Sequence, residues 1–146
     1  RLQALSPAAI DPDAKAAGQP DWDAYSQLVR QRFGVLTEAV LPTAQRAHAT
    51  PAQLRERLHY LKRHWEEVMA DVGATLRPAA SLSAQLRQAD CPGTFAQIGM
   101  SPERAHRAVV HSKDIRARYT ILHLAAELGL LEGWADDALG EPPETH

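Results

Sequence analysis

Histidines and carboxylates are the residues of this sequence that could bind a metal ion. Glu103 and His106 form a Glu-x-x-His motif, and His64 and Glu67 form the same motif in reverse. A carboxylate-bridged di-iron bundle needs two such motifs and a glutamate from each of two further helices. Because one pair cannot form this centre by itself, we interpret Glu103 and His106 as surface residues. A di-iron helical protein stays an alternative, which metal analysis would decide.

The sequence gives little indication of a catalytic nucleophile or of a nucleotide-binding site. Cys91 precedes a proline in a predicted turn, with no identifiable base beside it, so we interpret it as a thiol without a catalytic role. No glycine-rich G-x-G-x-x-G or P-loop motif occurs. An enzyme that binds a nucleotide on its own would need such a device, so the chain alone is predicted to bind no NAD(P) and to catalyse nothing.

Arg116 and Arg118 are the remaining candidates for a binding site. They stand before an apolar segment that Thr120 is predicted to cap, so the two cations would lie at the start of an anchored helix. A guanidinium can hold a phosphate or carboxylate by paired hydrogen bonds. The alternative interpretation is that both are surface charges, paired with Asp114 or with partners elsewhere.

Composition restricts the class of protein. The 146 residues suit one domain, and 16 basic against 18 acidic residues give a net charge of −2, without the basic excess typical of nucleic-acid binding. The apolar runs are too short to cross a bilayer. The single Cys91 and the lack of a signal peptide favour a cytoplasmic protein. Since the chain opens on Arg1, we expect a fragment or a processed piece.

The elements that must position these residues are predicted to be helices. Ala, Leu, Arg, Glu and Gln are abundant and no alternating β-branched run occurs, so the fold class is all-α, bundle-like, with five to seven helices. We expect residues 1–20 to be a linker or loop, residues 21–135 a helical domain and residues 136–146 a flexible tail.

Two helices are predicted in the first half of the domain. One begins after the N-cap Asp21, and Pro42 should end or kink it. The other begins at a capping box formed by Thr50 and Gln53. It is expected to be one long helix whose buried face includes Trp65; the apolar positions of this face are Leu54, Leu58, Leu61, Trp65, Val68 and Val72.

Shorter elements follow in the second half. Ser81 is predicted to cap a helix that reaches about Ala89, and residues 95–98 form one helical turn. Ser101 and the proline after it start another helix, whose inner face is Ala105, Val109 and Ser112. The apolar helix after Thr120 should be buried and end near Gly129.

Most of residues 1–135 resembles part of a known family. The segments that carry the resemblance are Ile115-Arg116-Ala117-Arg118-Tyr119-Thr120-Ile121-Leu122 and Leu128-Gly129-Leu130-Leu131, with Arg32-Phe33-Gly34, Leu61-x-x-x-Trp65 and Ile98-Gly99-Met100-Ser101-Pro102 upstream. They are similar to the C-terminal end of glycerol-1-phosphate dehydrogenases of the AraM-like branch. These enzymes belong to the iron-containing alcohol dehydrogenase and dehydroquinate synthase-like superfamily.

The resemblance implies an oxidoreductase with an upstream Rossmann-like domain that binds NAD(P), followed by an all-helical domain. A divalent metal between them, held by an Asp and two His, would polarise the hydroxyl of a glycerol phosphate-type substrate. The family's two His motifs are missing here, so no metal or cofactor ligand can be assigned to this chain. It would be the C-terminal helical domain of such an enzyme, inactive alone, with Arg116 and Arg118 on the substrate phosphate.

The partners implied are the upstream nucleotide-binding domain and the substrate, with no nucleic acid and no membrane, while a homo-oligomer stays open. The competing hypothesis is a free-standing helical module that binds a protein through an exposed apolar face. An open reading frame that continues upstream of Arg1 would favour the enzyme, and a nearby start codon would favour the module.

Overall fold

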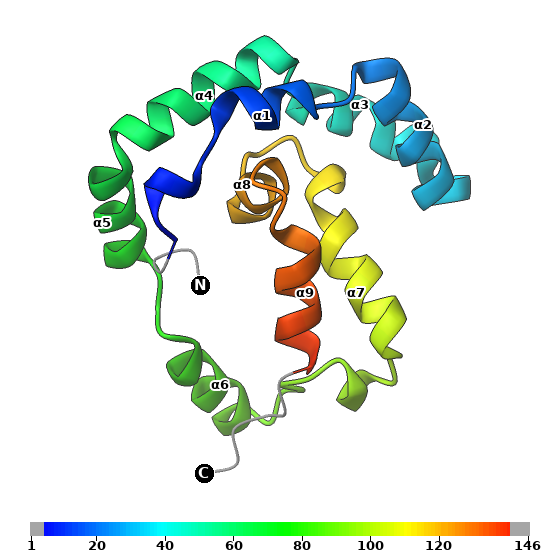
Figure 1. Cartoon of the computed structure of the whole chain (residues 1–146). Helices are drawn as coiled ribbons and strands as arrows, with labels where there is room; N and C mark the ends of the chain where they lie inside the picture. Colours follow the sequence, from blue (N-terminus) through cyan, green and yellow to red (C-terminus); the bar gives the residue numbers. More distant parts are fainter. Residues whose placement is uncertain (1–4, 141–146) are drawn as a thin grey trace.

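The computed structural model describes residues 5–140, and within this range all regular structure is helical, without a β-strand (Figure 1). The all-α, bundle-like prediction is therefore confirmed. The α-helices are α1 (Pro12–Ala17), α2 (Trp22–Phe33), α3 (Thr37–Ala47), α4 (Pro51–Arg63), α5 (Trp65–Thr75), α6 (Ala79–Gln88), α7 (Pro102–His111), α8 (Ile121–Glu127) and α9 (Leu131–Gly140). The 3-10 turns are η2 (Pro7–Ala9), η3 (Gly34–Leu36), η4 (Ala96–Ile98) and η5 (Ser112–Ile115).

Three helix starts predicted from capping signals are confirmed. The Asp21 carboxylate accepts from the Ala24 N–H at 2.8 Å, and the Ser101 hydroxyl accepts from the Arg104 N–H at 3.3 Å. At α4 the capping box is complete. The Gln53 N–H donates to the Thr50 hydroxyl at 3.3 Å, and the Thr50 N–H donates to the Gln53 side chain at 2.9 Å. Each cap satisfies backbone donors that the first helical turn leaves unpaired.

Within residues 5–140, helices extend further toward both ends than predicted. Residues 1–20 were expected to be a loop, but α1 lies within them, because the Asp11 carboxylate accepts from the N–H groups of Asp13 and Ala14 and Pro12 occupies the first helical position. Residues 136–140 belong to α9, not to a flexible tail. The rest of the expected tail, residues 141–146, lies outside the described residues.

We expected Pro42 to end or kink the helix that begins after Asp21. The helix instead ends at Phe33, directly before Gly34. Gly34 has φ +50°, a conformation that an α-helix does not contain and that glycine adopts readily. The chain passes through η3, and the Thr37 hydroxyl donates to the Gly34 carbonyl at 2.6 Å. Pro42 lies inside α3, where it removes one helical hydrogen bond without ending the helix.

The single helix predicted from Pro51 to Val72 is two helices, α4 and α5. At His64 the backbone leaves the helical region with φ −108° and ψ 23°. The hydrogen bonds on either side persist, from the His64 N–H to Tyr60 and from the Val68 N–H to His64, both at 3.0 Å. The Tyr60 ring stacks on His64 with 4.3 Å between centroids. The prediction that Trp65 is buried is confirmed, at 7% exposed.

The later elements agree with the sequence in outline. The turn expected at residues 95–98 is present as η4. α6 begins at Ala79, after Pro78, so Ser81 is not its cap. In α7 the buried residues are Ala105 and Val110, with Val109 half-buried, so the inner face is rotated from the prediction. The apolar helix is α8, which ends at Glu127, and Gly129 turns the chain at φ +69°.

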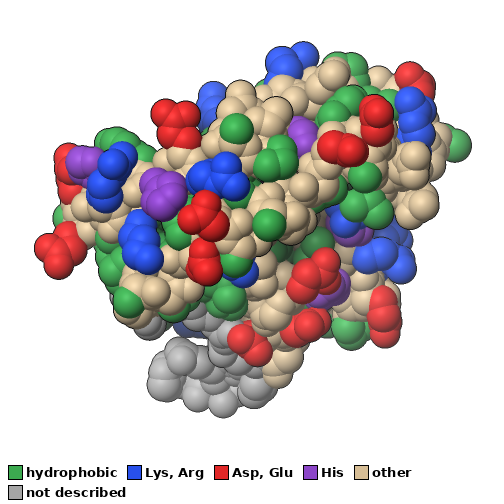
Figure 2. Space-filling view, turned by 45° about the horizontal axis from the view of Figure 1, so that its top comes forward, with side chains coloured by type: hydrophobic (Ala, Val, Ile, Leu, Met, Phe, Trp, Pro, Cys, Tyr) green, Lys and Arg blue, Asp and Glu red, His purple; other side chains and the backbone are tan. Residues whose placement is uncertain are grey.

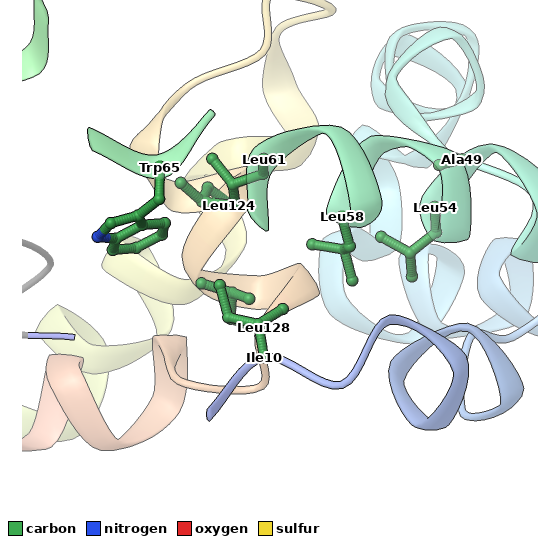
Figure 3. Close-up of a cluster of buried hydrophobic side chains, with 8 residues drawn as sticks. All are labelled: Ile10, Ala49, Leu54, Leu58, Leu61, Trp65, Leu124 and Leu128. Atoms are coloured by element: carbon green, nitrogen blue, oxygen red, sulfur yellow. The ribbon is translucent and has the colours of Figure 1, made fainter. Parts of the chain in front are cut away.

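The main core joins the first half of the chain to α8 (Figure 3). Figure 3 shows Leu54 and Leu58 projecting from the same side of α4 toward the segment that carries Ile10. Leu124 of α8 and Leu128, the residue directly after it, complete this cluster, whose members are Ile10, Ala49, Leu54, Leu58, Leu61, Trp65, Leu124 and Leu128. Two smaller clusters lie between α2 and α3 and between α7, α8 and α9. The burial of α8 predicted from its apolar sequence is therefore confirmed.

The surface shows no dominant charge on the face drawn in Figure 2. Basic and acidic side chains are intermixed there, together with histidines and scattered apolar side chains. A face that binds nucleic acid would gather cations instead. None of the helices within residues 5–140 combines the length and the apolar character that crossing a membrane requires.

Candidate functional site

A pocket of about 530 Å³ lies where α1, α2, the end of α3, η5 and α8 meet. We call it the central pocket. Its volume falls within the range typical of small-molecule sites. Its walls combine alanines and leucines with charged groups; the polar and charged side chains among them are Lys15, Gln19, Tyr25, Arg32, His48, Lys113, Asp114, His123, Glu127 and Glu132.

A buried carboxylate organises one wall of the central pocket. Asp114 is 2% exposed, and its Oδ1 accepts from the Tyr25 hydroxyl at 2.5 Å and from the Lys113 ammonium at 2.9 Å. The Lys113 ammonium also donates to the Tyr25 hydroxyl and lies 4.9 Å from the centroid of its ring. The Arg32 guanidinium reaches Asp114 Oδ2 at 3.7 Å. We call these four residues the Asp114 cluster.

A second carboxylate has a similar arrangement at α8. The Tyr119 hydroxyl donates to Glu127 Oε2 at 2.7 Å, and the Arg57 guanidinium donates to Glu127 Oε1. Arg57 also lies over the Tyr119 ring, 4.8 Å from its centroid. We call Arg57, Tyr119 and Glu127 the Glu127 cluster. In both clusters a tyrosine hydroxyl and a cation bind one carboxylate, and the cation covers the tyrosine ring.

A histidine stacks on the tyrosine of each cluster. His48 lies 4.8 Å from Tyr25 between ring centroids, and His123 lies 5.4 Å from Tyr119. The Nδ1 atom of His123 accepts from the Thr120 N–H at 3.1 Å, which fixes the neutral ring with its proton on Nε2. His48 Nε2 is buried and has no hydrogen-bond partner within the described part of the chain.

Burial sets the charge states of these groups. It raises the pKa of both tyrosines, and the neighbouring carboxylates Asp114 and Glu127 raise it further, so both phenols stay protonated donors. Burial also lowers the pKa of His48 and of His123, which favours neutral rings. Burial raises the pKa of the Glu127 carboxyl, against the opposite effects of Tyr119 and Arg57.

Arg116 and Arg118 lie outside the central pocket. Both are exposed, in the segment between η5 and α8, and Arg116 has extended backbone angles. Thr120 is the N-cap residue of α8, as predicted, so the arginines precede the helix and do not belong to its first turn. Within residues 5–140, neither guanidinium has an ion pair or a hydrogen bond, and the expected pairing with Asp114 is not formed.

The residues weighed as metal ligands do not form a metal site within residues 5–140. His64 Nδ1 is 3.2 Å from Glu67 Oε2, and His106 Nε2 is 3.2 Å from Asp136 Oδ1 of α9. A second forward Glu-x-x-His pair, Glu56 and His59, lies exposed on α4, so the motif count by itself does not decide against a di-iron bundle. Among residues 5–140, no three or more His, Cys, Asp or Glu side chains are grouped so that they could hold a metal. Cys91 is exposed.

Sequence reasoning did not find the two clusters. Tyr25 and Asp114 are 89 positions apart, and Arg57 and Glu127 are 70 apart. The local signal for the Asp114 cluster is the pair Lys113 and Asp114, in which a cation and a carboxylate are adjacent in the sequence. That signal resembles an ordinary surface pair until tertiary structure places Tyr25 against it.

Comparisons with known proteins identify no relative of this chain. No family model matches the chain, and neither a curated protein nor a solved structure matches it. The geometry described above is therefore the starting point for a functional proposal.

Proposed function

We propose that this chain is the C-terminal helical domain of a metal- and NAD(P)-dependent oxidoreductase similar to glycerol-1-phosphate dehydrogenase. The resemblance over residues 115–122 and 128–131 supports this proposal, and the all-α architecture agrees with what that resemblance implies. The observation that carries it is the pair Arg116 and Arg118. Two exposed guanidinium groups without partners inside residues 5–140 are free to bind a phosphate dianion.

The segment that bears the arginines is held at both ends. Before it, Asp114 is fixed by Tyr25 and Lys113. After it, Thr120 is joined to α8 through His123. A short segment anchored on both sides presents its cations with less ordering cost than a free loop would, and this is what a site that positions a substrate requires.

The chain's own contribution would be to the substrate. Residues 5–140 offer no ligand set for the divalent metal that the resemblance implies, and the sequence has no phosphate loop for NAD(P). In this proposal both groups belong to the upstream nucleotide-binding domain and the cleft beside it. Arg116 and Arg118 hold the phosphate end of a glycerol phosphate, and the reacting hydroxyl lies outside this chain.

The test uses the parent protein, expressed from the full open reading frame. In the variants Arg116→Gln and Arg118→Gln, the KM for glycerol 1-phosphate should rise about ten- to a hundredfold, since a hydrogen bond to a charged group contributes about 1.5–3 kcal/mol. Activity on glycerol should hardly change, because glycerol has no phosphate. Steady-state kinetics with both substrates measures the difference.

Arg87→Gln, in the exposed α6, is the matched control and should leave both KM values unchanged. If both substrates lose activity equally, or if the variants unfold at lower denaturant concentration, the two arginines are structural and the proposal is wrong. A reading frame that starts close to Arg1 would exclude the dehydrogenase before any assay.

The alternative function is a free-standing module that binds a protein partner. The exposed apolar side chains of residues 76–98 favour it; they include Leu76, Leu82, Leu86, Phe95 and Ile98, each at least 37% exposed. α6 buries none of its residues. The reading frame separates the two functions, since a start codon near Arg1 leaves these side chains without an upstream domain of the same protein to cover them.

A further inference from the structure

The central pocket contains positively charged hydrogen-bond donors that its carboxylates do not fully use. Its carboxylates Asp114 and Glu127 are each bound by a tyrosine hydroxyl and by at least one cation. Glu132, the third acidic residue of the lining, keeps 71% of its side chain exposed and lies 3.7 Å from His106. Asp114 Oδ2 is buried and has no hydrogen bond among residues 5–140, but the Arg32 guanidinium lies 3.7 Å from it, so a cation already faces this oxygen.

Lys15 is the clearest unused donor. Its ammonium lies against the turn after α8, 3.0 Å from the position that a Cβ would take at Gly129. Within the described range it makes no ion pair and no hydrogen bond, although the residue is half-buried and lines the pocket. A half-buried ammonium without a partner is costly, and an anion would compensate it.

Arg32 is the second donor. Its one ion pair, to Asp114 at 3.7 Å, is longer than a good hydrogen bond, and its side chain is 25% exposed. A guanidinium has five N–H donors, so a ligand can share Arg32 with Asp114. Because Lys113 already neutralises Asp114, the charge of Arg32 is available to an anion in the same pocket.

His48 adds a buried ring nitrogen. Its Nε2 atom has no hydrogen-bond partner among residues 5–140, and the residue lines the pocket. A ligand hydroxyl both donates and accepts, so it can bind this nitrogen in either tautomer of the ring. Cationic donors and an unpartnered imidazole nitrogen in one pocket together select an anion that also carries a hydroxyl group.

We propose that the central pocket binds a small hydroxylated anion, a hydroxy acid or a polyol phosphate, with its anionic group on Lys15 and Arg32 and a hydroxyl on His48 Nε2. This site goes beyond the proposed dehydrogenase function, because neither Arg116 nor Arg118 lines the pocket. It stands whether the chain is a domain of an enzyme or a free module.

The test is a titration of the full chain, labelled with ¹⁵N and followed by its amide NMR signals. Two pairs of probes separate the sources of the ligand: malate against succinate, and glycerol phosphate against propyl phosphate. Within each pair only the first compound carries a hydroxyl. The amides of Gly18, Gln19 and Gly129 should shift with saturation, and the partner without a hydroxyl should bind severalfold more weakly.

Lys15→Gln removes a cation that has no described partner, so it should weaken binding about tenfold and leave the fold intact. Arg32→Gln should weaken binding as well, with amide dispersion checked because Asp114 loses a neighbour. Arg87→Gln on α6 is the control and should bind as the parent chain does.

Three results would overturn the proposal. One is the absence of saturable shifts with either hydroxylated probe at millimolar concentration. Another is equal binding by Lys15→Gln and by the parent chain. The third is a set of shifts confined to residues 116–120, which would place the anion on the exposed arginines instead of in the pocket.

Discussion

Three buried or half-buried histidines share one electrostatic property. Burial holds the pKa of His48, His111 and His123 below the value of 6.5 usual for histidine. At His111 the charge of Arg32 acts in the same direction as burial. His123 is the most buried of the three, at 6% exposed, and its neutral form is the one that caps the Thr120 N–H. Folding therefore favours the uncharged ring at each position.

This property predicts a loss of stability in acid. The unfolded chain takes up protons near pH 6.5 and the folded chain only at lower pH, so the free energy of unfolding should fall as the pH drops below about 6.5. Glu127 acts in the opposite direction, because its raised pKa lets the folded chain bind a proton before the unfolded chain does. Thermal unfolding midpoints between neutral pH and pH ~5 measure the sum.

His123→Gln isolates one of these groups. Glutamine at this third helical position can still accept from the N-cap N–H, as in a capping box, but it does not titrate. The pH dependence of this variant should be shallower than that of the parent chain. His59→Gln, at an exposed position of α4, is the matched control for the substitution. An unchanged slope in His123→Gln would contradict the assignment.

Single elements follow local signals closely, which is why their starts could be predicted. Asp21, Thr50 and Ser101 each cap a helix through bonds to a residue three positions on. The breaks were predicted less well. Gly34 ends a helix that Pro42 was expected to end, and the bend at His64 has no glycine or proline to announce it.

The capping box of α4 gives a direct test at this scale. Thr50→Ala removes the acceptor for the Gln53 N–H and should lower the free energy of unfolding by about 0.5–2 kcal/mol. Ser81→Ala is the matched control, because the structure gives Ser81 no capping role in α6. Its stability in urea should equal that of the parent chain. Equal losses in both variants would show that the hydroxyl of Thr50 has no special function.

Across the whole molecule, contacts between distant segments decide what the sequence could not show. The apolar spacing from Leu54 onward predicted a buried face with Trp65 in it, but not that Leu124 and Leu128 would cover that face. The two clusters likewise depend on contacts between segments that are far apart in the sequence. The same contacts decide that Arg116 and Arg118 stay exposed. Periodicity reports which face is buried, and it carries no information about the partner.

A substitution of Trp65 tests the main core, which these distant segments form together. Trp65→Ala should lower the free energy of unfolding by about 3–5 kcal/mol, because a large buried aromatic leaves a cavity that the surrounding helices fill only in part. Leu82→Ala, at a position of α6 that is 45% exposed, is the control and should change stability little. Urea denaturation followed by circular dichroism gives both values. A small effect of Trp65→Ala would mean that α5 packs differently from this structure.

α6 contributes no buried residue to the core. In Figure 1 it lies at the opposite end of the view from α1 and α4, and no residue in it is buried. A protease that cuts after Arg77 or Arg87 would therefore meet little resistance. The two pieces would still share the core between α4 and α8, together with the bonds from Tyr25 to Asp114 and from Arg57 to Glu127. We therefore expect the chain to behave like a split protein, whose two halves reassociate when they are mixed.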